Sequence, residues 1–224
     1  MSNKQELIAK CPICQTKNSF TMWNSVNVTL DPELKSDILD LSIFKCTCSN
    51  CGFTEIINYN CLYHDMENKI VVHFINKNDP YVSKYEKLLE NFRKDGYLVR
   101  IVNSIFDLKE KLIIFDANLD DRIVEIYKMI IFRQFCEDYL DEEFDEEKIN
   151  NNVYIHFELI NSNNTSYVIN IYSYDYRLMM SIDFFDDAYK TVCDACLDKL
   201  PSIKNDNYVI DYNKALKIIN ENDL

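Results

Sequence analysis

Cys11-Pro12-Ile13-Cys14, close to the start of the chain, and Cys48-Ser49-Asn50-Cys51, further along, are the stretches that decide the fold of the N-terminal region. Each Cys-x-x-Cys turn directs two thiolates toward one point. Because zinc prefers four soft ligands in a tetrahedron, two such turns complete a closed structural site. The sequence therefore predicts one structural Zn²⁺ held by Cys11, Cys14, Cys48 and Cys51, with no position left for a catalytic water.

Details of this site stay open at the level of sequence. Gly52 follows the second pair, where the chain often needs a positive φ, whereas Gln15 holds the same place after the first pair. The two turns are therefore not expected to be fully equivalent. Cys46 competes with Cys48 as a ligand, and the two-residue spacing favours Cys48. Iron in a rubredoxin-like site would accept the same four thiolates, so the choice of zinc rests on ligand type.

The cysteines of the chain indicate neither secretion nor redox chemistry, and those outside the two pairs are not expected to bind a metal. The chain has 9 cysteines, an odd number, and the start Met1–Glu6 has no apolar signal core, so we expect a cytoplasmic protein without structural disulfides. Pro12 inside a pair so near the terminus does not offer the strand-helix unit of a thioredoxin-like motif. Cys193 and Cys196 fall on the apolar face of a predicted helix, and we expect them, like Cys61 and Cys136, to be buried.

The stretch from Cys11 to His73 resembles the CpXC domain, a bacterial and archaeal family with two cysteine pairs, the first with proline after its leading cysteine. The resemblance is not limited to the cysteines and covers about the first 130 residues. Similar segments lie between the two pairs, at 27–35, and after the second pair, at 62–65, 100–102, 110–112 and 119–125. The resemblance implies a zinc-ribbon-like domain. It implies no activity, because the function of the family is uncharacterised.

Composition excludes several classes of protein. With 2 glycines in 224 residues, the chain has neither a Walker loop nor a dinucleotide-binding fingerprint, both of which need several glycines in a short span. No run approaches the roughly 20 apolar residues of a membrane helix. The net charge is −13, and residues 1–75 hold 6 basic and 8 acidic side chains, so most of the acidic excess lies further along.

Periodicity and turn signals predict an α+β protein: an N-terminal zinc-ribbon-like antiparallel β domain over 1–78, then a helical and β-hairpin-bearing α+β region over 79–224. The first domain is expected to contain a short helix that begins with Asp31 as N-cap, a small aromatic core, and four strands. These strands are 18–29, 41–47, 53–60 and 69–75, and the core residues are Phe20, Trp23, Phe44, Phe53, Tyr59 and Phe74.

The second region is expected to combine five helices with four strands. The predicted helices are 81–94, 104–114, 121–140, 184–199 and 211–221, and the predicted strands are 97–102, 152–160, 166–173 and 176–183. Gly96 stands where the first of these helices needs a C-terminal cap.

Some residues invite a catalytic interpretation, and each has a plainer one. His64 and Asp65 look like an acid/base pair, but adjacent side chains in a strand point to opposite faces. Asp121 and Glu125, one turn apart beside Asp120, suit a divalent cation, although carboxylates that open a helix more often serve its N-terminal dipole. His73 and His156 are expected to be half-buried strand residues without nearby carboxylates.

Three functional classes remain. The favoured one is a zinc-stabilised interaction or scaffold protein with a protein partner. A nucleic-acid-binding zinc ribbon is less favoured, because the lysines of the ribbon are scattered rather than clustered. An enzyme with an unrecognised site in the C-terminal region is the third. The acidic segment 137–147, with its interleaved Tyr139, Leu140 and Phe144, suggests a docking site for a basic partner.

Overall fold

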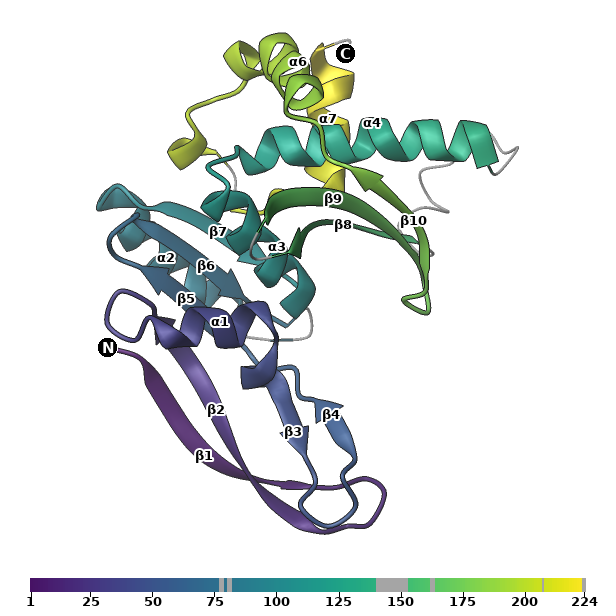
Figure 1. Ribbon diagram of the computed structural model, residues 1–224. Coiled ribbons are helices and arrows are strands. Elements are labelled where there is room, and N and C mark those ends of the chain that lie inside the picture. The colour runs from purple at the N-terminus through teal and green to yellow at the C-terminus, as the bar shows by residue number, and fades with distance from the viewer. Residues whose placement is uncertain (77–78, 80–81, 140–152, 162–163, 207, 223–224) are drawn as a thin grey trace. The chain divides into compact units, whose positions relative to one another are not determined.

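The structure is a computed structural model of the full chain, described here except for residues 77–78, 80–81, 140–152, 162–163, 207 and 223–224 (Figure 1). The chain forms two compact units. Unit 1 comprises Met1–Lys109 with Lys204–Tyr208, and unit 2 comprises Glu110–Ile203 with Val209–Leu224. The boundary predicted at 78/79 lies inside unit 1, and independent folding of residues 1–78 stays a prediction.

Unit 1 is built on a five-stranded mixed sheet with the order β1-β2-β5-β6-β7. The strands are β1 (Asn3–Lys10), β2 (Lys17–Asn27), β5 (Cys61–Asp65), β6 (Ile70–Phe74) and β7 (Leu98–Val102). The pairs β1/β2 and β5/β6 are antiparallel, whereas β2/β5 and β6/β7 are parallel. A separate two-stranded ladder, β3 (Lys45–Thr47) with β4 (Thr54–Ile56), runs beside the β1–β2 hairpin (Figure 1).

The helices of unit 1 follow their sequence signals with one difference. They are α1 (Glu33–Leu39), the short 3₁₀ helix η1 (Ser42–Phe44) and α2 (Val82–Lys94). Gly96 ends α2 with a φ of +82°, as its position predicts. The N-cap of α1 is Pro32 and has no side-chain cap, so the expected capping by Asp31 is wrong. The Asp31 carboxylate accepts a hydrogen bond from Ser2 Oγ instead.

An aromatic cluster forms the interior of unit 1. Phe20, Phe44, Tyr59 and Phe74 are buried as predicted, and the rings of Phe20 and Phe44 lie 5.8 and 5.0 Å from the Tyr59 ring. Phe53 is 39% exposed, so its assignment to this core is wrong. Trp23, also predicted for this core, is half-buried, and Lys4 Nζ lies 5.1 Å from its ring centroid.

A segment from late in the sequence completes unit 1. Ile101 of β7 donates its backbone N–H to the Tyr208 carbonyl at 2.8 Å, so residues 204–208 lie against the outer strand of the sheet. The guanidinium of Arg93 lies 3.9 Å from the Tyr208 ring centroid, and the Tyr208 hydroxyl donates to Glu90 at 2.9 Å. The sequence contained no signal for this return of the chain.

His73 of β6 is buried in unit 1, deeper than the half-buried position predicted for it. Its ring centroid lies 4.7 Å from that of Tyr85, and among the described residues its Nδ1 has no hydrogen-bond partner. Burial penalises the charged imidazolium and lowers the pKa of His73 to about 4.

This pKa predicts a loss of stability in mild acid. Between pH 6.5 and about 4 the unfolded chain binds a proton at His73 that the folded chain does not, so the free energy of unfolding falls as the pH falls through this window. The full loss is about 3 kcal/mol. Urea denaturation at pH 7 and pH 4.5 should show a shallower pH dependence for His73→Phe than for the wild type. Equal slopes in the two proteins would contradict the assignment.

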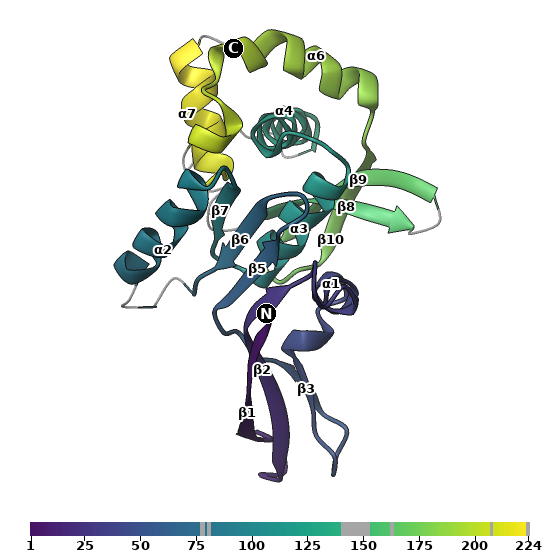
Figure 2. The same ribbon diagram turned by 90° about the vertical axis from the view of Figure 1, so that its left-hand side faces the viewer.

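Unit 2 packs one long helix between a sheet and two further helices. Its strands β8 (Val153–Asn161), β9 (Asn164–Ser173) and β10 (Leu178–Asp183) form an antiparallel sheet in the order β10-β9-β8. Its helices are α4 (Asp121–Tyr139), α6 (Asp186–Cys196), α7 (Tyr212–Asn222) and most of α3 (Ile105–Asp116). Figure 2 looks along α4 and shows α6 and α7 on either side of it. Short 3₁₀ turns, Leu197–Lys199 and Ile203–Asn205, follow α6.

The core of unit 2 joins α4 to the sheet through Phe132, Phe135, Cys136 and Ile171. Burial of Cys136, of Cys196 and, in unit 1, of Cys61 confirms the prediction for these thiols, whereas Cys193 is half-buried. Residues 140–147 of the acidic segment 137–147 lie outside the described residues. No described helix is long and apolar enough to cross a bilayer.

Candidate metal centre

The two cysteine turns have the same backbone structure. In the first, Cys11 N–H donates to the Thr16 carbonyl at 3.0 Å and Gln15 N–H donates to the Cys11 carbonyl at 2.9 Å. In the second, Cys48 N–H donates to the Phe53 carbonyl at 2.8 Å and Gly52 N–H donates to the Cys48 carbonyl at 3.0 Å. One turn connects β1 to β2 and the other connects β3 to β4, so each lies at the tip of a hairpin.

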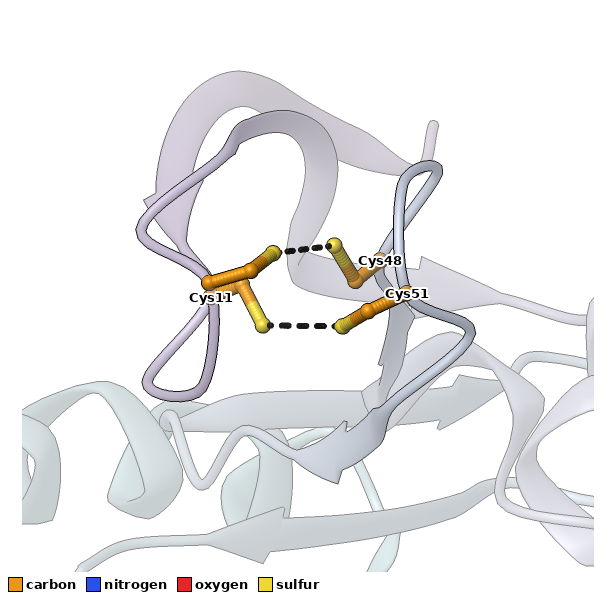
Figure 3. A group of neighbouring side chains, drawn as sticks. Cys11, Cys48 and Cys51 are labelled. Carbon is orange, nitrogen blue, oxygen red and sulfur yellow. Dashed lines mark hydrogen bonds between the residues drawn. The ribbon is translucent and has the colours of Figure 1, made fainter.

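The four sulfur atoms converge between these tips (Figure 3). Cys11 Sγ lies 3.6 Å from Cys51 Sγ, Cys14 Sγ lies 3.5 Å from Cys48 Sγ, and all four atoms are within 4.8 Å of one another. A tetrahedron with Zn–S bonds of about 2.3 Å has S···S edges of about 3.8 Å. The cluster therefore fits one tetrahedral metal ion, and its four thiols fill the coordination shell.

Polar groups around the cluster hold the two turns together and favour thiolate at Cys14. Asn18 Oδ1 accepts hydrogen bonds from the backbone N–H and the hydroxyl of Ser49, both at 2.9 Å, which ties β2 to the second turn. Hydrogen bonds with the hydroxyl and the backbone of Thr16 lower the pKa of the Cys14 thiol to about 5. At Cys51, a hydrogen bond with the Phe53 backbone acts to lower the pKa, but burial and the neighbouring thiols outweigh it and raise this pKa to about 12. Thiolate is the form that binds a metal.

Cys46 lies outside the cluster of four, in agreement with the choice of Cys48 by spacing. It is half-buried in the middle of β3, and burial, together with the nearby Glu55 carboxylate, raises the pKa of its thiol.

Gln15 and Gly52 occupy equivalent positions, which the sequence did not indicate. Gln15 has a φ of +60° and Gly52 has a φ of +74°, so both are left-handed. The expectation that the two turns differ is therefore wrong for the backbone. Gln15 adopts the left-handed conformation despite the steric penalty of its Cβ atom. The Gln15 side chain donates to the Pro12 carbonyl at 3.2 Å.

This equivalence predicts opposite effects for two exchanges. Gln15→Gly should raise the free energy of unfolding by about 0.5–1 kcal/mol, because glycine adopts a positive φ without the Cβ penalty. Gly52→Ala should lower it by about 1 kcal/mol through the backbone alone, because no atom lies within 4 Å of the added Cβ. Thermal denaturation of the metal-loaded variants measures both. A destabilised Gln15→Gly would contradict the argument.

His64 and Asp65 make separate structural contacts. The His64 ring in β5 packs edge-on against the Phe92 ring at 5.0 Å and lies 5.3 Å from the Tyr97 ring. Burial lowers the pKa of His64. The Asp65 carboxylate accepts hydrogen bonds from the backbone and side-chain N–H groups of Asn68, at 2.9 and 2.8 Å, and so closes the β5–β6 turn.

A buried ionic network in unit 2 is the feature that sequence reasoning missed. Lys111 Nζ lies 3.1 Å from Asp121 Oδ2 and 3.3 Å from Glu125 Oε1. Lys128 Nζ lies 2.8 Å from Glu110 Oε1 and 3.0 Å from Glu125 Oε2. All five side chains are more than nine-tenths buried. Asp121 and Glu125 therefore have buried lysines as partners, which neither the divalent-cation interpretation nor the helix-dipole interpretation predicted.

His156 adjoins this network. Its Nδ1 lies 3.8 Å from Glu110 Oε2, so the expectation that no carboxylate is near it is wrong. Glu110 also accepts the backbone N–H of Phe157 at 2.6 Å. Burial acts to raise the pKa of Glu110, but Lys128 and His156 outweigh it and hold this pKa well below its ordinary value.

The hairpin-borne cluster of four cysteines defines a candidate metal-binding α+β protein. Residues 9–128 match the family model described as CpXC protein, more than half of the chain, and the chain belongs to this family. The matched range contains the four cysteines and all five residues of the ionic network.

Among curated proteins, the chain is similar to the DNA polymerase delta catalytic subunit of Plasmodium falciparum (isolate K1 / Thailand), with 27% identity over 131 residues. The similarity covers 55% of this chain and 11% of that protein, so the chain spans about a tenth of this relative. No solved structure matches the chain.

Proposed function

We propose that Cys11, Cys14, Cys48 and Cys51 hold one structural Zn²⁺ and that the chain is a zinc-stabilised interaction or scaffold protein. The observation that carries the proposal is the convergence of four sulfur atoms within 4.8 Å of one another, on two turns of equal structure. A shell of four thiolates leaves no open position, which is typical of structural rather than catalytic zinc.

A surface for a partner is available next to the clasp, by which we mean the two cysteine turns and their four sulfur atoms. Seven of the eight residues of β1 are exposed. Ile8 and Ile13, on β1 and on the first cysteine turn, are 66% and 67% exposed. Large apolar side chains on a projecting hairpin support a role in binding another protein.

Metal analysis of the purified full chain tests the zinc assignment. We expect one equivalent of zinc per chain by elemental mass spectrometry. After exchange for Co²⁺, we expect the visible spectrum of a tetrahedral four-thiolate site. One equivalent of iron in place of zinc would contradict the metal assignment. A chain that binds no metal with all thiols reduced would overturn the proposed function.

A further inference from the structure

The outer edge of β1 is unpaired. β1 is the first strand of the five-stranded sheet, and on the side opposite β2 it has no neighbouring strand in the part of the chain that the structure describes (Figures 1 and 2). Cys11 donates its backbone N–H to the Thr16 carbonyl, and the ladder runs from there to Lys4 without a shift. Backbone groups alternate in direction along an antiparallel ladder. The N–H and C=O groups of the even-numbered residues therefore point away from β2: Lys4, Glu6, Ile8 and Lys10.

This edge is accessible to another chain. It belongs to a hairpin that projects from the rest of the five-stranded sheet, because β5 pairs with β2 at Ser25–Asn27 alone. Ile8 is two-thirds exposed near the middle of the edge. An unpaired strand edge with exposed side chains is a template for pairing with a further strand.

Residues 6–10 are complementary to themselves when the segment is reversed. The sequence Glu6-Leu7-Ile8-Ala9-Lys10 begins with a negative side chain, ends with a positive one and is apolar in between. In an antiparallel pair of two such segments about a twofold axis at Ile8, Glu6 lies opposite the partner's Lys10 at both ends. Ile8 lies opposite its own copy. These residues carry the outward backbone groups, so each opposed pair exchanges both N–H···O bonds.

The charges around Lys10 favour such a partner. Lys10 lies directly opposite Lys17 of β2, both side chains are exposed, and neither forms an ion pair with a described residue. Like charges directly opposite each other destabilise an antiparallel pair. A second copy would place its Glu6 on the other side of Lys10, on the same face of the sheet. The Glu6 carboxylate accepts the hydroxyls of Thr21 and Ser19, at 2.7 and 3.2 Å, and with about four acceptor sites it can also accept a lysine.

Neighbouring registers are less favourable. The outward direction of the even-numbered backbone groups allows the pairing to slip only to a register that again joins even-numbered residues. The next register in one direction places Lys4 opposite the partner's Lys10, which is a like-charge pair. The next register in the other direction places Glu6 opposite the partner's Pro12, which has no N–H to donate. The sequence therefore selects the register centred on Ile8.

We propose that the outer edge of β1 pairs with the same edge of a second copy of this chain, antiparallel about a twofold axis at Ile8. The two hairpins would then form one continuous sheet in the order β2-β1-β1-β2. The clasp lies at one end of β1 and the pairing with β5 at the other, so the remaining strands of the two unit-1 sheets lie at opposite ends of this sheet. Segment 6–10 buries less than about 1,200 Å², and we expect a dissociation constant of about 10–100 μM.

This inference rests on the proposed function, because it names the partner of the exposed strand that the clasp holds at one end. Sedimentation equilibrium of the zinc-loaded full chain over a series of concentrations measures its mass in solution. We expect the mass to rise from that of one chain to that of two as the concentration increases. A chain that stays monomeric up to about 1 mM would overturn self-pairing.

Charge exchanges test the register. Glu6→Lys places a lysine opposite the partner's Lys10 at both ends, and Lys10→Glu opposes two carboxylates in the same way. Each variant alone should dimerise about tenfold more weakly, or less still. An equal mixture of the two variants, and a chain with both exchanges, restore opposite charges at both ends and should dimerise as the wild type does.

Two further variants separate charge from backbone pairing. Lys4→Glu is the matched control for Lys10→Glu, because it changes the charge equally on the same face of β1 but lies outside segment 6–10. It should dimerise at least as well as the wild type. Ile8→Pro removes an N–H at the twofold axis that takes no part in the β1–β2 ladder, so the hairpin should persist while dimerisation weakens by about tenfold or more.

The results divide clearly. Wild-type dimerisation by Glu6→Lys, by Lys10→Glu or by Ile8→Pro, a mixture of the two charge variants that stays monomeric, or loss of the dimer in Lys4→Glu would each overturn the pairing. Zinc is quantified in every variant, which separates the two proposals. A monomeric wild type with one equivalent of zinc contradicts self-pairing alone. A dimer that is sensitive to Glu6→Lys but holds no zinc contradicts the proposed function alone.

Discussion

Replacing Cys51 by Ser should abolish metal binding and unfold the region around the clasp. The site would keep three thiolates, and the two hairpins would lose the ion that joins their tips. Structural zinc contributes about 10–16 kcal/mol in small peptides, whereas a whole domain is stable by about 5–15 kcal/mol. We therefore expect Cys51→Ser to lose near-stoichiometric zinc and to become sensitive to protease over residues 1–75.

Cys46→Ser is the matched control for this prediction. It removes a thiol two residues from Cys48 that lies outside the cluster of four. This variant should keep one equivalent of zinc and the protease resistance of the wild type. Loss of zinc in Cys46→Ser would show that the four ligands are assigned wrongly, whereas a compact and metal-free Cys51→Ser would show that the region around the clasp does not need the metal to fold. Unit 2, which has its own apolar core, should stay folded in both variants.

Replacing Lys128 by Met should destabilise unit 2 by about 3–5 kcal/mol, because it leaves buried carboxylates without their cation. Lys128 contacts both Glu110 and Glu125, at 2.8 and 3.0 Å. Burial acts to lower the pKa of Lys128, but Glu110 and Glu125 outweigh it and raise this pKa above its ordinary value. Because the pKa of Lys128 is higher in the folded than in the unfolded protein, Lys128 stabilises the fold at any pH below its unfolded pKa. Because the pKa of Glu110 is lower in the folded than in the unfolded protein, Glu110 stabilises the fold at any pH above its unfolded pKa. Both contributions are present in full at pH 7.

Urea denaturation at pH 7, followed by the near-ultraviolet circular dichroism of the aromatic residues, measures this effect. Lys190→Met is the matched control, because Lys190 forms an exposed pair with Asp187 at 3.4 Å in the same unit. Exposed pairs contribute about 0–1 kcal/mol, so this variant should unfold close to the wild type. Equal denaturation midpoints for the two variants would contradict a stabilising role of the buried network.

The clasp was predictable from sequence because its ligands are local. Two residues between cysteines fix each turn, and the metal requires the two turns to meet. The amphipathic helices α2 and α4 and the β8–β9 hairpin were predictable for a similar reason, since apolar periodicity and turn residues lie within each segment. Strand β1 was not predicted, because Asn3–Lys10 is exposed on both faces and has no alternating pattern.

The ionic network was not predictable because its partners come from different helices. Lys111 and Glu125 are 14 residues apart, and Glu110 and Lys128 are 18 residues apart, so no i,i+4 rule connects them. In sequence, each of these charges is typical of a solvent-exposed helix face. Tertiary packing brings the pairs between α3 and α4 together and excludes water, whereas Glu125 and Lys128 form an i,i+3 pair within α4.

The contact of Tyr208 with β7 has a consequence for how the molecule is made. Unit 1 recruits residues 204–208, so it is discontinuous along the chain. On the ribosome, the strands of unit 1 are complete once residue 109 has emerged, but the edge of β7 stays uncovered while about a hundred further residues are added. At about 5–20 residues per second, this takes roughly 5–20 s. During synthesis, the edge of β7 is therefore exposed in addition to that of β1, until residues 204–208 cover it.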